Sequence, residues 1–246
     1  MAQKEILSSV MGAVLATFVV PATALADNPV IYQSELSSST YPHMAKGLYA
    51  TLGLGFSTPQ PTSGHEPTHY GYSIYGHVYK ATGFSGETGG GYDFGPARVE
   101  LTYAYTNNAL NTSKASASGI TEEAGLSGSM TAQTILISAY YDLYNRSHFA
   151  PYIGGGIGYG NIEQSKVTFK LPYGTGVSDP AHKGVLAYRA KLGITYLASK
   201  KFDLFAEGVY QGSGAYSGSG GFAPGVCDIG PSNDFGAKAG IRYHFL

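Results

Sequence analysis

The chain has 246 residues and a formal net charge of −1, with 15 basic and 16 acidic residues. This balance argues against a nucleic-acid partner, which would require a strongly basic face. The 35 glycines and 21 tyrosines, with only 13% charged residues, indicate many strands, tight turns and interfacial aromatics. The single cysteine, Cys227, excludes an intramolecular disulfide framework. It falls in "GFAPGVCDIGPSND", a predicted loop in which the thiol has no recognisable base.

The N-terminal residues have the pattern of a cleaved secretory leader. A weakly basic start precedes the apolar run Val10–Val20, and "ALA" ends at Ala26 with the small residues that signal peptidase accepts. The alternative is a transmembrane anchor, but a run of about 11 apolar residues is too short to span a bilayer. We therefore expect a leader over residues 1–26, a periplasmic lead-in over 27–45 and one β-barrel domain over 46–246.

Eight segments then alternate between apolar and polar residues with period two. The first places Leu48, Leu52 and Phe56 on one face, and no segment has a convincing helical period. Strands of about ten residues that are apolar on one side have the length that crosses a membrane with tilt. The segments are Lys46–Phe56, Gly83–Gly95, Ala97–Thr106, Ala132–Leu143, Ala150–Ile162, Val185–Leu197, Phe202–Gln211 and Asp234–Phe245.

The connections between these segments alternate in length. Three are short, and between them lie four long polar stretches rich in Gly and Ser, predicted to be loops. Because an open sheet edge cannot exist in hydrocarbon, we expect the last segment to close the wall. The pattern predicts an all-β fold, an eight-stranded antiparallel up-and-down transmembrane β-barrel with both termini periplasmic. The short connections are Gly95-Pro96, Tyr144–Phe149 and Ala198–Lys201; the long ones are Ser57–Thr82, Asn107–Thr131, Glu163–Gly184 and Gly212–Asn233.

Four stretches resemble the opacity-type, OmpA-like family of eight-stranded outer-membrane surface proteins. They are "GLYATLGLGF", "PARVELTYAY", "APYIGGGIGYG" and "DFGAKAGIRYHF", in that order and at matching spacing. The resemblance implies that a terminal aromatic, here Phe245 with Tyr243, helps mark the last strand for the barrel-insertion machinery. Leu246 follows Phe245, which departs from the family pattern. Nothing resembles the periplasmic peptidoglycan-binding domain of full-length OmpA.

The same alternation predicts what fills the barrel. An eight-stranded barrel is only wide enough for side chains to fill it, so buried charges of both signs should form ion pairs. We predict a lumen charge network of Arg98, Glu100, Arg189, Lys191, Asp203, Glu207, Lys238 and Arg242, with Tyr140, Asp142 and His244 also inward. The inward glycines Gly154, Gly156, Gly158 and Gly160 either leave room for Arg189 and Lys191 or permit strong coiling.

Three motifs imitate chemical sites. "HEPTH", His65–His69, matches a zinc-protease pattern, but Pro67 and its flanks favour extended or turn structure over the helix that the motif needs. "GGGIGYG" lacks the glycine spacing and the helix of a dinucleotide site. Asp179 and His182 imitate an acid–base pair without a second pair beside them. We predict no catalytic, cofactor-binding or metal-binding residues.

The favoured function is therefore a bacterial outer-membrane surface protein that is not an enzyme. Its barrel would anchor loops that meet host matrix molecules or immune factors, in adhesion, immune evasion and envelope integrity, with outer-membrane lipids and lipopolysaccharide as surroundings. The loops are rich in Ser, Gly, Thr, Tyr and His, which suits adaptable and rather weak contacts. The alternative is a small pore or ligand-passing barrel. No residue constellation supports a third hypothesis, a barrel enzyme.

Overall fold

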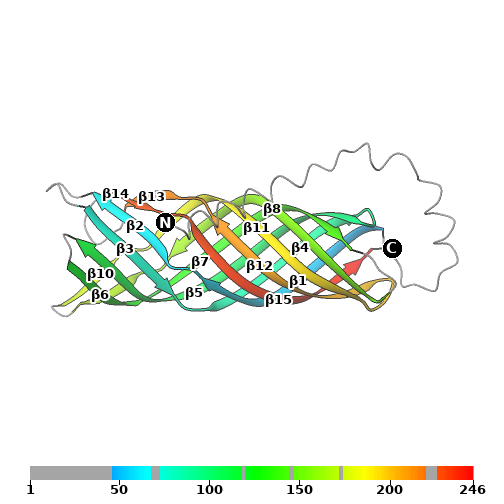
Figure 1. The fold of residues 1–246 in the computed structure, drawn as a ribbon, viewed down its shortest axis with the longest axis horizontal. Coiled ribbons are helices and arrows are strands. Elements are labelled where there is room, and N and C mark those ends of the chain that lie inside the picture. Colours follow the sequence, from blue (N-terminus) through cyan, green and yellow to red (C-terminus); the bar gives the residue numbers. More distant parts are fainter. Residues whose placement is uncertain are drawn as a thin grey trace, which may run out of the picture. The chain divides into compact units, whose positions relative to one another are not determined.

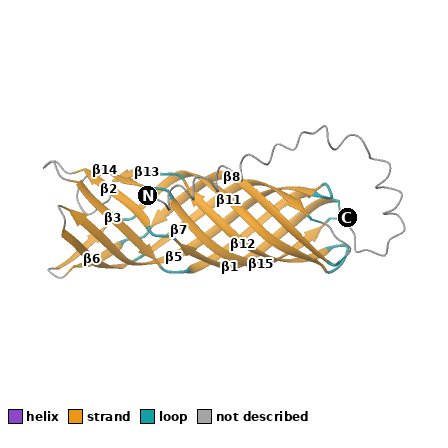
Figure 2. Cartoon of the chain, in the orientation of Figure 1, coloured by secondary structure: helices purple, strands orange, loops and turns teal. Residues whose placement is uncertain are grey.

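A computed structural model describes residues 46–67, 73–117, 120–143, 147–171, 174–219 and 226–245. The expected leader and lead-in lie outside the described residues, as does Leu246. Within the described ranges the chain forms 15 β-strands, and Figure 2 draws strands joined by short turns. None of these residues belongs to a helix long and apolar enough to cross a membrane.

Eight strands form the closed barrel that the sequence predicts. Each pairs with its neighbours in antiparallel fashion, and β1 pairs with both β4 and β15, so the last strand closes the wall. The strand ends lie within a few residues of the predicted segment ends, except that the strand predicted to end at Thr106 continues to Ala117. The eight are β1 (Gly47–Pro59), β4 (Gly83–Asp93), β5 (Ala97–Ala117), β7 (Ser129–Asp142), β8 (Phe149–Gln164), β11 (Ala181–Leu197), β12 (Phe202–Ser213) and β15 (Ser232–His244).

The outer surface of this wall is apolar and its inner surface is polar. In β1 the exposed Leu52 and Leu54 alternate with the buried Thr51. Aromatic side chains gather at both rims. Phe149 packs on Tyr196 and Phe202 on Tyr243 at one rim, while Tyr210 packs on Phe235 at the other, with ring centroids 5.0 or 5.1 Å apart. Such an apolar band between aromatic girdles is the surface that a transmembrane barrel presents to lipid.

The three short connections join strands at the rim where β15 ends. At the first, Gly95 has a φ of +107°, which favours glycine, and its amide donates to Asp93 Oδ1 at 2.7 Å. Phe94 N also donates to Ala97 O at 2.9 Å and closes the turn. The second connection is described only from residue 147. In the third, Ser199 N donates to Phe202 O at 2.9 Å.

The four long polar stretches were predicted to be loops, and this prediction was wrong in detail. Each carries strands that continue a barrel hairpin. The β1–β4 register, with Ser57 opposite Gly83, continues unchanged into β2 and β3, with Thr62 opposite Val78. Periodicity missed these strands because a sheet wetted on both faces has no reason to alternate apolar with polar residues.

Seven strands make up this extension, which Figure 1 shows at the end of the barrel opposite the C-terminus. Cys227 accordingly lies in a strand rather than in the predicted loop, and so does His65 of the zinc-protease pattern. The strands are β2 (Thr62–Pro67), β3 (Ser73–Lys80), β6 (Ile120–Ser127), β9 (Val167–Leu171), β10 (Gly174–Ser178), β13 (Tyr216–Ser219) and β14 (Val226–Ile229).

Candidate functional site: the charged lumen and its outer mouth

The barrel encloses a dense set of charged side chains. All eight residues of the predicted charge network are buried inside it, together with Asp142 and His244. The structure divides them into separate clusters along the lumen. Among the described residues, five cations and six carboxylates are buried: Arg98, Arg189, Lys191, Lys238 and Arg242, with Glu87, Asp93, Glu100, Asp142, Asp203 and Glu207.

The largest cluster surrounds Glu87 of β4. Its carboxylate lies 3.1 Å from Arg189 Nη1, 2.5 Å from Lys191 Nζ and 2.5 Å from Lys238 Nζ. These cations come from β11 and β15, so the cluster ties three strands together across the barrel. One carboxylate offsets only one of these three positive charges, so a second acidic group is needed nearby where water has little access.

Glu207 of β12 forms the second acidic centre beside this cluster. Lys191 Nζ lies 2.9 Å from Glu207 Oε1, and the hydroxyl of Tyr152 donates to Glu207 Oε2 at 2.6 Å. Lys191 therefore bridges Glu87 and Glu207. Arg189, the other β11 cation, also donates to Gln211 Oε1 through its Nε atom at 2.9 Å.

Arg98 of β5 pairs with Asp142 of β7 in a two-point contact. Its Nε donates to Asp142 Oδ2 at 2.6 Å and its Nη2 to Asp142 Oδ1 at 3.0 Å. The guanidinium also lies over the rings of Tyr140 and Tyr152, 4.9 and 5.0 Å from their centroids. Two-point pairing and aromatic faces together suit a buried arginine, because the planar group is weakly hydrated.

Glu100 has hydroxyl groups rather than a cation as its hydrogen-bond partners. Its carboxylate accepts from Tyr49 at 3.1 Å, from Tyr140 at 3.4 Å and from Thr102 at 2.8 Å. Arg98 and Glu100, which the sequence places in the same network, thus belong to different groups of contacts. The hydroxyl donors satisfy the carboxylate oxygens in the way that buried charge requires.

A third acidic centre lies at the rim where β15 ends. Asp203 Oδ2 accepts from Arg242 Nη1 at 3.4 Å and lies 2.7 Å from His244 Nε2. The Arg242 guanidinium also lies 5.3 Å from the centroid of the Tyr49 ring. The lumen at this rim thereby combines charge pairs with aromatic packing.

The inward glycines of β8 make room for a neighbour that the sequence did not indicate. A Cβ atom at Gly154 would overlap the ring of Tyr140, and one at Gly156 would overlap the hydroxyl of Ser138. Both neighbours come from β7. The space is thus filled from β7, and not by Arg189 and Lys191 of β11 as one of the two readings supposed.

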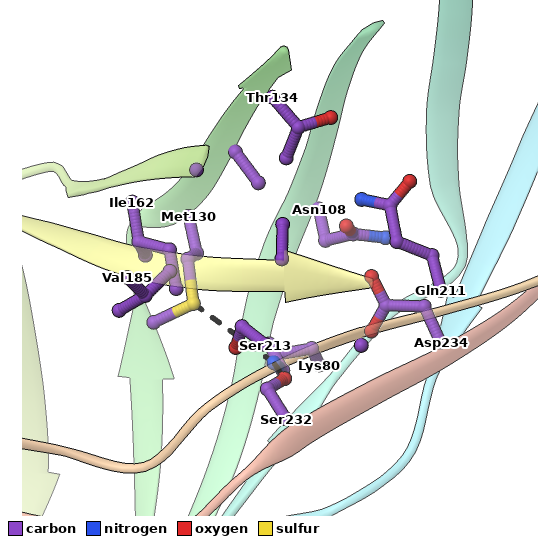
Figure 3. Close-up of a pocket in the computed structure, with 14 residues that line it drawn as sticks. Lys80, Asn108, Met130, Thr134, Ile162, Val185, Gln211, Ser213, Ser232 and Asp234 are labelled. Atoms are coloured by element: carbon purple, nitrogen blue, oxygen red, sulfur yellow. Dashed lines mark hydrogen bonds between the residues drawn. The ribbon is translucent and has the colours of Figure 1, made fainter. Parts of the chain in front are cut away.

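The lumen ends at its outer mouth in a small cavity of about 40 Å³, shown in Figure 3. Lys80 of β3 reaches this level and donates to Ser232 Oγ at 3.0 Å and to Met130 Sδ at 3.9 Å. Burial lowers the pKa of Lys80 below its ordinary value, and the Asp234 carboxylate opposes that change. A cavity of this size holds only a few water molecules.

The structure does not assemble the motifs that imitated chemical sites. His65 packs against Tyr75 with ring centroids 5.0 Å apart, in a strand rather than a helix. His69 lies outside the described residues. Asp179 and His182 are exposed. Within the described ranges no three His, Cys, Asp or Glu side chains gather as metal ligands would.

Sequence reasoning missed two buried carboxylates, Glu87 and Asp93. Both lie in the predicted segment Gly83–Gly95, where the run of glycines between Phe84 and Tyr92 weakens the apolar face that would assign the inward side. The even spacing between these two carboxylates could have revealed them. Glu87 is six residues from Asp93, so both side chains point to the same face of a strand.

A wall that is apolar outside and ion-paired inside is suited to lipid, and closed antiparallel barrels of this kind cross bacterial outer membranes. The chain is an outer-membrane β-barrel surface protein. Residues 55–217 match the model of the surface antigen family, and the chain belongs to that family.

One curated relative and two solved structures illustrate the likeness. Outer membrane protein PagN of Salmonella typhimurium strain LT2 is 27% identical over 176 residues, which cover 66% of this chain and 73% of that protein. Neisserial surface protein A is 19% identical over 82% of this chain and 100% of its own, with a TM-score of 0.46. The outer membrane protease OmpT of Escherichia coli is 9% identical over 82% of this chain and 98% of its own, with a TM-score of 0.51. At such identity the OmpT likeness concerns the fold alone.

Proposed function

We propose that the barrel is an inert anchor and that its four extended hairpins contact host surface or matrix molecules in adhesion or immune evasion. The protein would accordingly carry out no reaction. The observation that carries the proposal is the packed lumen beneath a long extension. Glu87 and its three cations fill the interior, while strands continue well beyond the aromatic rim.

The composition of the extension supports this role. Its strands carry polar pairs such as Ser63 with His77 at 3.2 Å and Ser217 with Asp228 at 2.7 Å. Hydroxyl, imidazole and phenol groups on a rigid sheet form adaptable hydrogen bonds with many surfaces. Exposed loops and tips positioned by a rigid scaffold are where binding residues concentrate.

Two further partners belong to the proposal. Lipopolysaccharide would surround the outer aromatic rim, and the barrel-insertion machinery would read the last strand through Tyr243 and Phe245. Phe245 is exposed to lipid and stacks edge-on with Tyr243, with ring centroids 5.1 Å apart. Its amide donates to Leu48 O at 2.9 Å, so this aromatic lies at the closing pair of strands.

The test removes the extension and keeps the barrel. Each hairpin is cut between two directly opposed residues and rejoined by Asn-Gly, the two-residue turn that matches strand twist. Cells with the trimmed barrel should lose binding to host matrix proteins while the amount inserted stays equal. Undiminished binding by the trimmed barrel would refute the proposal. The cut pairs are Ser57 with Gly83, Asn107 with Thr131, Gly158 with Ala187, and Ser213 with Ser232.

A further inference from the structure

The extension repeats the barrel's strand order except at one junction. The β12–β15 register continues into β13 and β14, and the β8–β11 register continues into β9 and β10. The junction between β11 and β12 does not continue in this way. Its ladder stops at Ala187 opposite Ser213, and beyond Leu186 no strand among the described residues forms a ladder with β11 on that side.

We call this segment the seam edge: Ala181–Leu186 of β11, on the side facing away from β8. One contact shows which backbone groups point outward there. Leu186 O accepts from Gly214 N at 2.9 Å, across the junction. Because successive residues of a strand point their N–H and C=O groups to alternate sides, Gly184 and His182 direct theirs to the same side as Leu186. The seam edge therefore presents two further donor–acceptor pairs.

The side chains along the seam edge are accessible as well. Residues Ala181 to Gly184 are all exposed, so side chains on both faces of the strand are accessible there. In the rest of β11, exposed and buried residues largely alternate. The other side of the segment is fully occupied, because β8 pairs with it up to Gln164 opposite Ala181. Pro180 precedes the segment and sets its outer limit. Among the described residues, the result is a short strand edge without a ladder partner on the side away from β8, with β13 nearby.

We propose that the seam edge binds an extended peptide segment of a partner protein by strand addition. Unpaired strand edges recognise backbone, and alternate side chains add selectivity. Lys183 and His182 lie along this edge, so acidic or hydroxyl-bearing residues in the peptide are favoured by charge and hydrogen bonding. This assigns a partner class to the proposed surface role and rests on it.

A second copy of the chain is a poor occupant of the seam edge. Barrel strands tilt by roughly 40° from the membrane normal. Two copies related by a two-fold axis along that normal would cross their β11 strands at about 80°, which no ladder tolerates. A flexible segment from outside the membrane has no such restriction.

The experiment uses the full-length barrel in lipid nanodiscs and a fluorescent eight-residue peptide in which valine alternates with threonine and glutamate. Saturable binding is expected, together with slower hydrogen exchange of the His182 and Gly184 amides. His182→Pro removes a seam-facing donor and spares the β8 ladder, so it should weaken binding by about tenfold or more. The matched control, His182→Ala, keeps the backbone donor and loses only the imidazole, so it should bind at least about threefold more tightly than the proline variant.

A peptide with the same sequence, N-methylated at every residue, should not bind, since neither of its edges can donate. Equal binding of the methylated and unmethylated peptides would overturn the proposal, as would unchanged exchange at Gly184. Equal affinities of the proline and alanine variants would do the same. Peptide binding without any effect of trimming on host-cell binding would instead refute only the adhesive role.

Discussion

Lys238 Nζ and Glu87 Oε2 lie 2.5 Å apart although the two residues are 151 positions apart in the sequence. Lys238 belongs to β15 and Glu87 to β4, the two strands that flank β1. Their β1 partners are Gly55 and Gly53, which have no side chain to block the contact. The ion pair thus spans the strand at which the wall closes, linking the last strand to the second barrel strand from inside.

Removing the shared carboxylate should destabilise the barrel strongly. Glu87→Ala leaves Arg189, Lys191 and Lys238 with one carboxylate fewer, and we expect a loss of about 3–5 kcal/mol in the free energy of unfolding. A denaturant titration in detergent, in which the folded fraction is read from heat-modifiable gel migration, measures this loss of stability. The control is Glu123→Ala, whose exposed pair with Lys114 should contribute at most about 1 kcal/mol. Equal midpoints for both variants would contradict the prediction.

Glu207→Ala should cost less than Glu87→Ala. Removing one member of a buried ion pair costs about 3–5 kcal/mol when the other charge is left unpaired. The structure gives Lys191 a second carboxylate, Glu87, so the cation keeps a partner when Glu207 is removed. The hydroxyl of Tyr152 loses its acceptor in the same variant. The same titration ranks the two, and a larger loss for Glu207→Ala would show that Glu87 is not the centre of the cluster.

Gly154→Ala should destabilise the barrel by about 1–3 kcal/mol through overpacking against Tyr140. Gly155→Ala is the matched control, because its added Cβ would meet nothing closer than Arg189 O at 3.4 Å. Combining Gly154→Ala with Tyr140→Ala removes the overlap with the ring but not the 2.8 Å approach to Ala139 O, so the combined loss should be smaller than the sum of the two single losses. Strict additivity would mean that Tyr140 does not limit the space at Gly154.

The purified wild type should show negligible conductance in planar lipid bilayers. The lumen carries ion pairs from the Asp203 level to the Glu87 level, and the outer mouth holds a cavity of about 40 Å³. Charges paired at contact distance and largely shielded from water attract strongly, so opening a path would require breaking them. Steady, ion-selective channels would favour the alternative of a small pore.

Phe245→Ala should reduce insertion of the barrel more than Leu246→Ala. Phe245 packs on Tyr243 at the end of the closing strand. Leu246 lies outside the described residues. The amount of heat-modifiable protein in the outer membrane measures insertion. Full and equal insertion of both variants would show that the insertion machinery does not recognise the terminal aromatic.

The barrel strands were predictable because lipid and lumen impose opposite demands on alternate residues. Ile137, exposed, and Ser138, buried, illustrate the contrast that made β7 visible. Outside the membrane this contrast is lost, and strands such as β13, "YSGS", look like loop. The alternation in the sequence also indicated that the side chains of Arg189 and Glu207 point into the lumen. Their partners were not, because pairing depends on the stagger of strands far apart in the chain.

In three of the four hairpins the register runs unbroken from barrel to extension, so the number of residues in the arms sets the height of the tip. One residue added to each arm raises a tip by about 3.3 Å along its strand and leaves every pair below it unchanged. An addition to one arm alone must be absorbed locally. The β5 hairpin shows how: Ala109 faces Ser129, yet Thr112 faces Gly125, a one-residue offset that falls beside Gly128. Height above the membrane and the shape of the tip can therefore change in this lineage by different kinds of insertion, without disturbing the part that lies in lipid.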